Sequence, residues 1–405
     1  GPVVVELPQD VVSQEIPDNE LNYSSPKVMT SVPSVGDIRD AARALVDAKD
    51  PLIWAGAGVM SAQATDELRA LAELLEVPVY TSLVGKSAID ERHPLALGSG
   101  GMTTTGPARQ WLDDSDVMFA VGTSLTTTPY GQRFDPDKFL IHCVNDVNEI
   151  NKDTVCDVGL VGDAKLTLAL MIDCVKGIIG EEGRTTGVMK RIKAAKDIWW
   201  ASWMPYLKND SDPISPYRVI WELNQNLDKE SSIVTHDAGA PRDQIGPFYT
   251  ATTPHSYVGW GKTTHLGASI PLMIGAKKAM PDRMCVAFMG DAAFGMSGLD
   301  METAVRADLP ITVVLLNNGI MATYPGGTPT AREQFGVTHM SGDYGKIAMG
   351  MGAEGIYVNK ALELPDALQK ASRFNKEGKT VMIDVKTRNE DSRAPRRFVE
   401  KNSVN

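Results

Sequence analysis

The pairs Gly290-Asp291 and Asn317-Asn318 are the residues of this sequence whose types and spacing best fit a chemical role. The first pair follows an apolar run at 284–289 that is typical of a buried strand, and the second follows another run at 311–316. A helix predicted over 297–307 makes the two strands parallel, so their carboxyl ends meet at one edge of a sheet. The Asp291 carboxylate, the Asn318 amide oxygen and a free backbone carbonyl nearby would form a hard oxygen site suited to Mg²⁺.

A phosphate group is the natural partner of such a cation, because Mg²⁺ usually completes its octahedron with phosphate oxygens. Ala292 and Ala293 have small side chains, which lets their backbone N–H groups approach a phosphate at the start of a helix. The alternative is an ordinary turn of an α/β protein, with Asp291 and Asn318 as capping residues. The position of both pairs at the ends of successive strands favours the metal and phosphate site.

The segment from Gly290 to Asn318 resembles the thiamine diphosphate (ThDP) motif of the acetolactate synthase and 2-oxo acid decarboxylase superfamily. The family's third glycine is Ala292 here, which still leaves room for a diphosphate. The resemblance implies ThDP and Mg²⁺ as cofactors, with the Ile320 carbonyl as the third protein ligand of the metal after Asp291 and Asn318. The cofactor-binding residues implied around this motif are Gly290, Asp291, Ala292, Ala293, Asn318, Ile320 and Met321.

Two more segments extend the resemblance. His236-Asp237-Ala238-Gly239 matches the family's Asp-Val-Gly segment, so Ala238 and Gly239 are expected to help hold the diphosphate. The glycine-rich stretch 259–279 matches the family's Gly-Thr-Met-Gly segment, in which Leu266 takes the place of the apolar residue that bends ThDP. The Thr264 carbonyl and the Leu266 N–H would then bind the aminopyrimidine ring, and the bend brings its amino group beside C2 of the thiazolium ring.

Two residues of this stretch are candidates for catalysis. Leu266 would act through the bend, and a plain core position is the alternative. His265 would lie in or beside the same cavity and donate a proton near physiological pH, whereas a lone histidine commonly has a structural role. His236 is likewise either a site residue or only the last residue of a strand.

The composition argues against several other classes of function. The net charge of −11 and the pI near 5.1 argue against nucleic acid as a partner, because no basic stripe offsets the acidic balance. No apolar run approaches the roughly 18 residues of a membrane-spanning helix, and no signal peptide is visible. Four cysteines without metal-ligand spacing are expected to be buried thiols of a reducing compartment, which favours a cytoplasmic location.

Strands alternate with helical stretches along most of the 405 residues, which indicates an α/β fold with two doubly wound parallel-sheet domains. A central domain resembling the family's TH3-like middle domain is expected at 35–185, with strands predicted at 51–56, 77–81, 117–121 and 139–144 and a helix at 64–75. The diphosphate-binding (PP) domain is expected at 186–385. It opens with a helical connector whose tryptophans we expect to pack. Its further strands are predicted at 232–235, 355–358 and 380–385, and its helices at 216–226, 269–279, 342–351 and 364–374.

The two ends of the sequence have a different character. Residues 1–34 begin with a strand-like run at 3–7 and continue as a polar linker. The run resembles the closing strand of the family's pyrimidine-binding (PYR) domain, whose bulk is then missing from this chain; Gly1-Pro2 as a cloning remnant is the alternative. The tail 386–405 is either solvated or a lid whose arginines meet the phosphates of coenzyme A. These arginines are Arg388, Arg393, Arg396 and Arg397.

Several cofactors are candidates for the ligand of the central domain. In the family this domain binds FAD in acetolactate synthases and ADP or coenzyme A in the acyl-CoA branch. Thr123-Ser124-Leu125-Thr126-Thr127 replaces the Arg-Phe-Asp-Asp-Arg segment of flavin-binding members, so FAD is disfavoured. The Gly56-Ala57-Gly58 turn lacks a third glycine, and it fits a nucleotide phosphate and tight packing of a strand on a helix equally well.

The stretch GDAAFGMSGLDMET resembles 2-hydroxyacyl-CoA lyases and oxalyl-CoA decarboxylases more than acetolactate synthases. We therefore expect a lyase or carboligase acting on a 2-hydroxyacyl-CoA, and an acetolactate synthase-like enzyme acting on 2-oxo acids is the alternative. In the family the PYR domain supplies the glutamate that activates the aminopyrimidine. The expectation is one half of a split or processed enzyme, paired with a PYR polypeptide in a dimer or tetramer of such pairs. A non-catalytic ThDP-binding subunit is the third interpretation.

Overall fold

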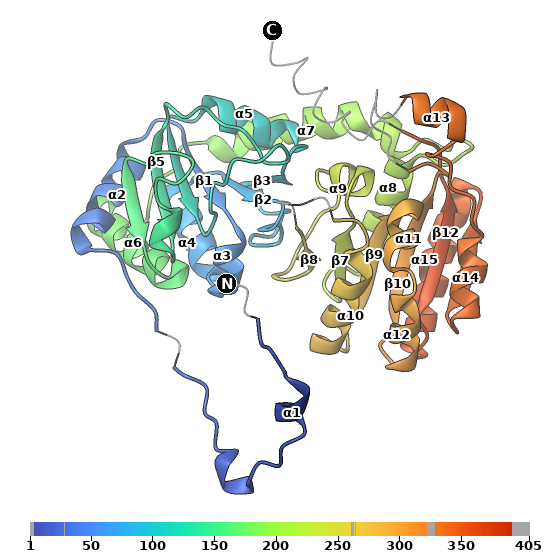
Figure 1. Cartoon of the computed structure of the whole chain (residues 1–405). Coiled ribbons are helices and arrows are strands. Elements are labelled where there is room, and N and C mark those ends of the chain that lie inside the picture. Colours follow the sequence, from blue (N-terminus) through green and yellow to red (C-terminus); the bar gives the residue numbers. More distant parts are fainter. Residues whose placement is uncertain (1–3, 28, 261–262, 264, 322–328, 391–405) are drawn as a thin grey trace. The chain divides into compact units, whose positions relative to one another are not determined.

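The computed structural model describes residues 4–27, 29–260, 263, 265–321 and 329–390, and the chain divides into the units 1–31 and 32–405. The first unit holds two short helices, α1 (Gln9–Val12) and the 3-10 helix η1 (Asp18–Glu20) (Figure 1). Over the described residues 4–7, the strand predicted at 3–7 is wrong: the segment is exposed and joins no sheet. A strand needs a neighbour for its backbone hydrogen bonds, and the described part of this unit offers none.

Six parallel strands form the first sheet, in the order β3-β2-β1-β4-β5-β6. The strands are β1 (Pro51–Ala55), β2 (Val79–Ser82), β3 (Ala96–Gly100), β4 (Val117–Val121), β5 (Phe139–Val144) and β6 (Val158–Val161). The helices around them are α2 (Val35–Asp47), α3 (Ala57–Ser61), α4 (Thr65–Leu75), α5 (Gly106–Asp114), the 3-10 helix η2 (Val147–Glu149) and α6 (Ala164–Ile179). The chain order reverses between β1 and β4, which makes the sheet doubly wound.

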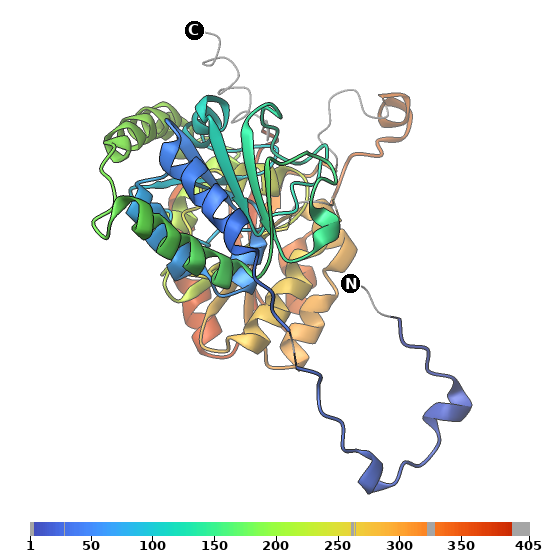
Figure 2. The same ribbon diagram turned by 90° about the vertical axis from the view of Figure 1, so that its left-hand side faces the viewer.

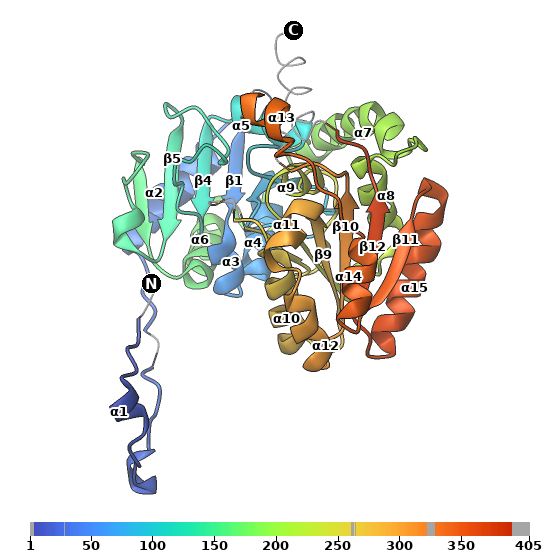
Figure 3. The ribbon, with the colours of Figure 1, turned by 45° about the vertical axis from the view of Figure 1, so that its right-hand side comes forward.

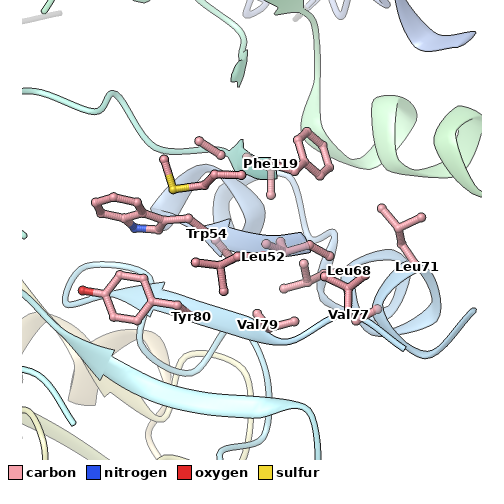
Figure 4. Close-up of a cluster of buried hydrophobic side chains, with 14 of the residues drawn as sticks. Leu52, Trp54, Leu68, Leu71, Val77, Val79, Tyr80 and Phe119 are labelled. Atoms are coloured by element: carbon pink, nitrogen blue, oxygen red, sulfur yellow. The ribbon is translucent and has the colours of Figure 1, made fainter. Parts of the chain in front are cut away.

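The packing in the core of this sheet explains why its elements could be predicted from the sequence. Leu68 and Leu71 lie one turn apart on α4 and are fully buried with the strand residues, as Figure 4 shows. Trp54 of β1 and Tyr80 of β2 meet edge to face with ring centroids 5.2 Å apart. Helices α2 and α6 pack on each other (Figure 2, blue and green) and cover the strands from outside.

The Gly56-Ala57-Gly58 turn is a point of close backbone packing. The Gly58 N–H donates to the carbonyl of Gly122 over 2.8 Å. A Cβ atom at Gly58 would lie 2.6 Å from the Gly122 Cα, and one at Gly56 would lie 2.3 Å from the Gly122 oxygen. These contacts support the packing interpretation of the two glycines.

Six parallel strands also form the second sheet, in the order β11-β12-β10-β9-β7-β8 (Figure 3). The strands are β7 (Ser232–His236), β8 (Tyr257–Val258), β9 (Met284–Gly290), β10 (Ile311–Asn317), β11 (Glu354–Val358) and β12 (Val381–Lys386). The helices are α7 (Val188–Leu207), α8 (Pro216–Asn226), α9 (Ala240–Ile245), α10 (Ser269–Ala279), α11 (Asp291–Ser297), α12 (Asp300–Arg306), α13 (Pro329–Phe335), α14 (Tyr344–Gly350), the 3-10 helix η3 (Ala361–Glu363) and α15 (Leu364–Lys376). Two doubly wound parallel sheets flanked by helices confirm the predicted fold class.

The helix predicted at 297–307 is the main error within this sheet. Two helices, α11 and α12, replace it, and the first begins at Asp291 directly after β9. Seven-residue helices are too short to show a helical period in the sequence. The early start matters, because it puts Ala292 and Ala293 in the first helical turn after the Gly-Asp pair.

Both faces of the second sheet are covered. Along β9, Val286 and Phe288 belong to one buried cluster, while Cys285, Ala287 and Met289 belong to another on the opposite face. The strand therefore has no polar face, which is why it appears as a continuous apolar run in the sequence.

Helix α7 connects the cores of the two sheets. Its first turns, with Val188 and Ile192, pack in the core of the first sheet, and Trp199 and Trp203 pack in that of the second. Trp199 stacks on Phe248 with centroids 5.7 Å apart. The predicted packing role is thus confirmed for these two tryptophans.

The cysteines only partly match their prediction. All four are free thiols, but only Cys143 and Cys285 are buried, while Cys156 and Cys174 are partly exposed. Within the described ranges, no helix combines the length and apolarity needed to cross a membrane.

Candidate active site

A cavity of about 300 Å³ lies where the chain order of the second sheet reverses, at the carboxyl ends of β7 and β9 and of the adjacent β10. Doubly wound sheets bind ligands at this type of position. Ten residues predicted to bind the cofactor line the cavity: Ala238, Gly239, Leu266, Gly290, Asp291, Ala292, Ala293, Asn318, Ile320 and Met321. The eleventh, Thr264, lies outside the described residues.

The register of β9 and β10 brings the two polar pairs together. Gly290 pairs with Leu316, so the segments that follow β9 and β10 leave the sheet at the same edge (Figure 3). The Asp291 carboxylate accepts a hydrogen bond from its neighbour Ala292 N–H (2.8 Å) and another from Gly319 N–H (2.7 Å). Only 2% of Asp291 is exposed, and burial raises the pKa of its carboxyl group.

The backbone after Asn318 keeps the Ile320 carbonyl free of the neighbouring segment 338–340. Gly319 and Met321 hydrogen-bond to the segment 338–340 over 2.9 and 2.7 Å. In an antiparallel pair, alternate residues face the partner strand, so the N–H and C=O groups of Ile320 face away from that segment. Its N–H donates to the Asn318 side-chain oxygen (3.0 Å), and both residues line the cavity.

The two asparagines at the end of β10 have different roles. Asn317 donates from its side-chain amide to Asp384 on β12 (2.9 Å), and it does not line the cavity. Asn318 is a lining residue of the cavity. The side chain of Asn317 therefore links β10 to β12, whereas Asn318 is available to a ligand.

Asp237 supports the walls of the cavity, a role that sequence reasoning missed. Its side chain is fully buried and accepts four hydrogen bonds, from Ala238 N–H, Gly267 N–H, Ser269 N–H and the Ser269 hydroxyl. The available signal was its place in the same strand-end segment as Ala238 and Gly239. The partners lie about thirty positions further along the chain, so only the fold identifies them.

The two candidate histidines lie outside the lining of the cavity. His236 is fully buried, stacks on Trp260 with centroids 5.1 Å apart, and accepts the backbone N–H of Trp260 at Nε2 (3.3 Å). Burial lowers the pKa of His236 to about 3, so its imidazole is neutral at physiological pH. These contacts support the structural interpretation of His236. His265 is exposed, and its role as a proton donor stays a prediction.

The cavity has further lining residues that the sequence did not indicate, among them Pro216, Asp243, Gln244 and Glu390. Glu390 is held by the Ser215 hydroxyl and by Arg388 (2.9 Å). Arg388 of the predicted lid is therefore engaged in an ion pair within the chain. The other three tail arginines lie outside the described residues.

The residues present fit a magnesium-bound diphosphate. Asp291 is a buried carboxylate without an ion pair among the described residues, and its neighbours offer the neutral oxygen ligands that Mg²⁺ prefers. Gly239 has a φ of 78°, and a Cβ atom there would meet nothing within 4 Å, so this wall leaves room for a ligand. When bound, ThDP would supply an electron sink for making or breaking a C–C bond beside a carbonyl.

A clustered metal site of another kind is not found in the described part of the chain. No group of three or more His, Cys, Asp and Glu side chains gathers there. The predicted set needs only one such residue, Asp291, because its other ligands are an amide oxygen and a backbone carbonyl. Zinc-type sites, which need several such side chains, do not fit these residues.

The first sheet has a second cavity, of about 380 Å³. It lies at the carboxyl ends of β1 and β4, where that sheet reverses, and Trp54 and the segment 123–128 line it. This segment is the one that replaces the flavin-type sequence. Coenzyme A, ADP or FAD as its ligand stays a prediction.

Two family models match the chain. The model of the thiamine pyrophosphate enzyme central domain matches residues 38–171, and the model of the thiamine pyrophosphate enzyme C-terminal TPP binding domain matches residues 237–385. The second match starts at Asp237 and ends within β12. It therefore covers every predicted cofactor residue described above.

Curated relatives match most of the chain. The probable acetolactate synthase large subunit of Methanococcus aeolicus is 30% identical over 397 residues, which cover 92% of this chain and 65% of that protein. The acetolactate synthase isozyme 3 large subunit of Escherichia coli (strain K12) is 29% identical over 404 residues, covering 95% of this chain and 68% of that protein. The chain thus spans about two thirds of the length of these relatives.

Proposed function

Because the chain belongs to the thiamine pyrophosphate enzymes of the acetolactate synthase superfamily, we propose that it holds ThDP and Mg²⁺ for a carboligase acting on 2-oxo acids. One observation carries this proposal. Asp291, Asn318 and Ile320 meet Leu266 and the wall at 238–239 around one cavity. A metal site, a wall with room for a diphosphate and an apolar residue are the three parts that a bent, magnesium-bound ThDP requires.

The residues have separate tasks in this proposal. Asp291, Asn318 and the Ile320 carbonyl hold Mg²⁺, and the small residues at 238–239 and 292–293 let the diphosphate approach the backbone. Leu266 packs against the middle of the cofactor and keeps it bent. The buried surroundings of Asp291 exclude water from the cation, which strengthens the attraction between the metal and the diphosphate.

The relatives favour a 2-oxo acid enzyme over the 2-hydroxyacyl-CoA lyase that the stretch at 290–303 predicted. The position of that stretch explains why it is a weak guide to substrate. Of its residues, only Gly290 to Ala293 line the cavity, while the distinguishing part at 294–303 does not. That part packs or is exposed on α11 and α12, away from the lining of the cavity.

The activating glutamate of this proposal comes from a PYR domain. Three carboxylates line the cavity among the described residues, and each already has partners: Asp243 pairs with Arg242, Glu390 with Arg388, and Asp291 accepts two backbone N–H groups. Activation of the aminopyrimidine needs a carboxylate that is free to hydrogen-bond to the ring. We therefore assign it to a PYR domain on a partner polypeptide.

The experiment first asks whether the protein binds ThDP, by titration calorimetry with and without Mg²⁺. Native mass spectrometry then identifies any PYR-domain polypeptide that accompanies it. The purified assembly is finally tested with pyruvate and with a 2-hydroxyacyl-CoA. Turnover of pyruvate without coenzyme A supports the proposal, strict dependence on the acyl-CoA favours the lyase, and ThDP binding without any turnover by the complete assembly favours a non-catalytic subunit.

A further inference from the structure

We propose that Asp237 is a positioning residue that fixes the spacing between two walls of the cavity, the wall at Ala238–Gly239 and the wall at Leu266. The inference rests on the proposed function, which assigns the diphosphate to the first wall and the bend of ThDP to the second. Asp237 itself does not line the cavity. It would act through the residues that it holds.

One oxygen of the Asp237 carboxylate joins the two walls directly. Oδ1 accepts the Ala238 N–H at 2.8 Å and the Gly267 N–H at 2.9 Å. Ala238 follows β7, and Gly267 follows Leu266 in a loop about thirty residues later. Because one atom receives both bonds, a shift of the Leu266 loop relative to the Ala238 wall must break at least one of them.

The second oxygen fixes where the loop ends. Oδ2 accepts the N–H of Ser269 at 3.0 Å and its hydroxyl at 2.7 Å. Ser269 is fully buried and is the first residue of α10. The residues 265–268 are thus held at their end by the helix and in their middle by the bond to Gly267.

Helix α11 is a second close neighbour of the loop. Gly267 has a φ of 87°, and a Cβ atom there would lie 2.9 Å from the Ser297 hydroxyl oxygen and 3.0 Å from the Met296 Cβ. The loop is therefore close to the helix that begins at Asp291 as well as bonded to Asp237. Contact with α11 prevents movement toward that helix, and the bonds to Asp237 restrain the loop further.

The arrangement needs a carboxylate. Four donors converge on the two oxygens of Asp237, and the described residues offer it no ion pair, so hydrogen bonds alone hold its side chain. An asparagine of the same shape has one acceptor oxygen, and its NH₂ group would face N–H donors. Replacement by asparagine should therefore release either the Gly267 side or the Ser269 side of the loop.

The first test needs no cofactor. In Asp237→Asn, amide hydrogen exchange of peptides covering 265–269 should accelerate by about tenfold, because their anchoring bonds are lost. Exchange in β9 and β10 should stay unchanged. The exposed Asp308→Asn is the matched control and should leave all peptides unchanged. Unchanged exchange at 265–269 in Asp237→Asn, or an equal acceleration throughout the sheet, would overturn the proposal.

The second test asks whether Asp237 acts through Leu266. In the ThDP-loaded assembly, Asp237→Asn should slow hydrogen exchange at C2 of the cofactor by about tenfold, with a smaller loss of cofactor affinity. In a Leu266→Ala background the same substitution should have little further effect. Equal slowing in both backgrounds would overturn the positioning role. Absence of ThDP binding by the unaltered assembly would instead refute the proposed function and leave the first test valid.

A third variant covers the case in which Asp237→Asn does not fold. Ser269→Ala removes the hydroxyl contacts to Oδ2 and to the Met289 sulfur, and it keeps the three backbone bonds to Asp237. Exchange at 265–269 should then rise by a few-fold in a protein whose circular dichroism is unchanged. A folded Ser269→Ala protein with unaltered exchange there would count against the proposal.

Discussion

The carboxylate of Asp291 accepts a hydrogen bond from the backbone N–H of Gly319, 2.7 Å away. This bond joins the end of β9 to the loop after β10. Gly319 lies between Asn318 and Ile320, so one contact holds the three proposed metal ligands in a single group. Gly319 has a φ of 69°, a conformation that favours glycine and allows the N–H to turn back toward Asp291.

Loss of the Asp291 carboxylate should remove the metal site. In Asp291→Ala we expect the Mg²⁺-dependent affinity for ThDP to fall by at least about a hundredfold, because the only charged ligand of the cation is gone. Calorimetry with and without Mg²⁺ measures the change. The exposed Asp308→Asn should bind as the unaltered protein does. If Asp291→Ala binds ThDP with unchanged affinity, the metal assignment is wrong.

Shortening Leu266 should affect the cofactor's reactivity more than its binding. In Leu266→Ala the apolar support of the bend is lost, so hydrogen exchange at C2 of ThDP should slow by about tenfold or more. The dependence on Mg²⁺ should be retained, because no metal ligand is altered. Leu299→Ala is a matched control, since Leu299 is the N-cap residue of α12 and is 79% exposed. An unaltered exchange rate in Leu266→Ala would refute the bending role.

The elements with local signals were predictable from the sequence. Helix α8 was predicted at its observed bounds, because Ser215 caps it by accepting the Tyr217 N–H and Pro216 occupies its first turn. Helix α10 was also predicted at its observed bounds, and the buried strands β4 and β5 appeared as apolar runs with their observed ends.

The features that depend on tertiary contacts were not predictable in this way. The start of α11 has no local period, and the segment at 4–7 has strand propensity but no partner to pair with. Asp237 illustrates the limit for the site. Its type and position were visible, but its bonds to Gly267 and Ser269 exist only because β7 and the loop before α10 lie side by side.

The glycine contacts of the first sheet predict a loss of stability. In Gly58→Ala the new Cβ atom would lie 2.6 Å from the Gly122 Cα, and neither backbone can move without disturbing β1 or β4. We expect the free energy of unfolding to fall by about 1–3 kcal/mol, measured by urea denaturation. Gly177→Ala in α6 meets no atom within 4 Å and should instead gain about 0.5–1 kcal/mol. Equal effects of the two substitutions would contradict the packing role of the turn.

The buried His236 predicts a loss of stability in acid. Its pKa is lowered to about 3 by burial, whereas an unfolded histidine has a pKa near 6.5, so below that pH the unfolded chain binds a proton that the folded chain does not. The stability from His236 is complete above about pH 6.5 and falls as the pH drops toward 3. By pH 5 the loss amounts to about 2 kcal/mol. Urea midpoints between pH 7 and pH 5 measure it.

The slope with pH, rather than stability at one pH, separates titration of His236 from its packing. His236→Gln loses the stacking on Trp260 and is destabilised at every pH, but its stability should fall less steeply between pH 7 and pH 5. His142, whose pKa burial also lowers, keeps its share of the slope in both proteins. The exposed His255→Asn should keep the full slope, and asparagine tolerates the φ of 60° at that position. If His236→Gln retains the full slope, the neutral buried imidazole is not the source of the acid sensitivity.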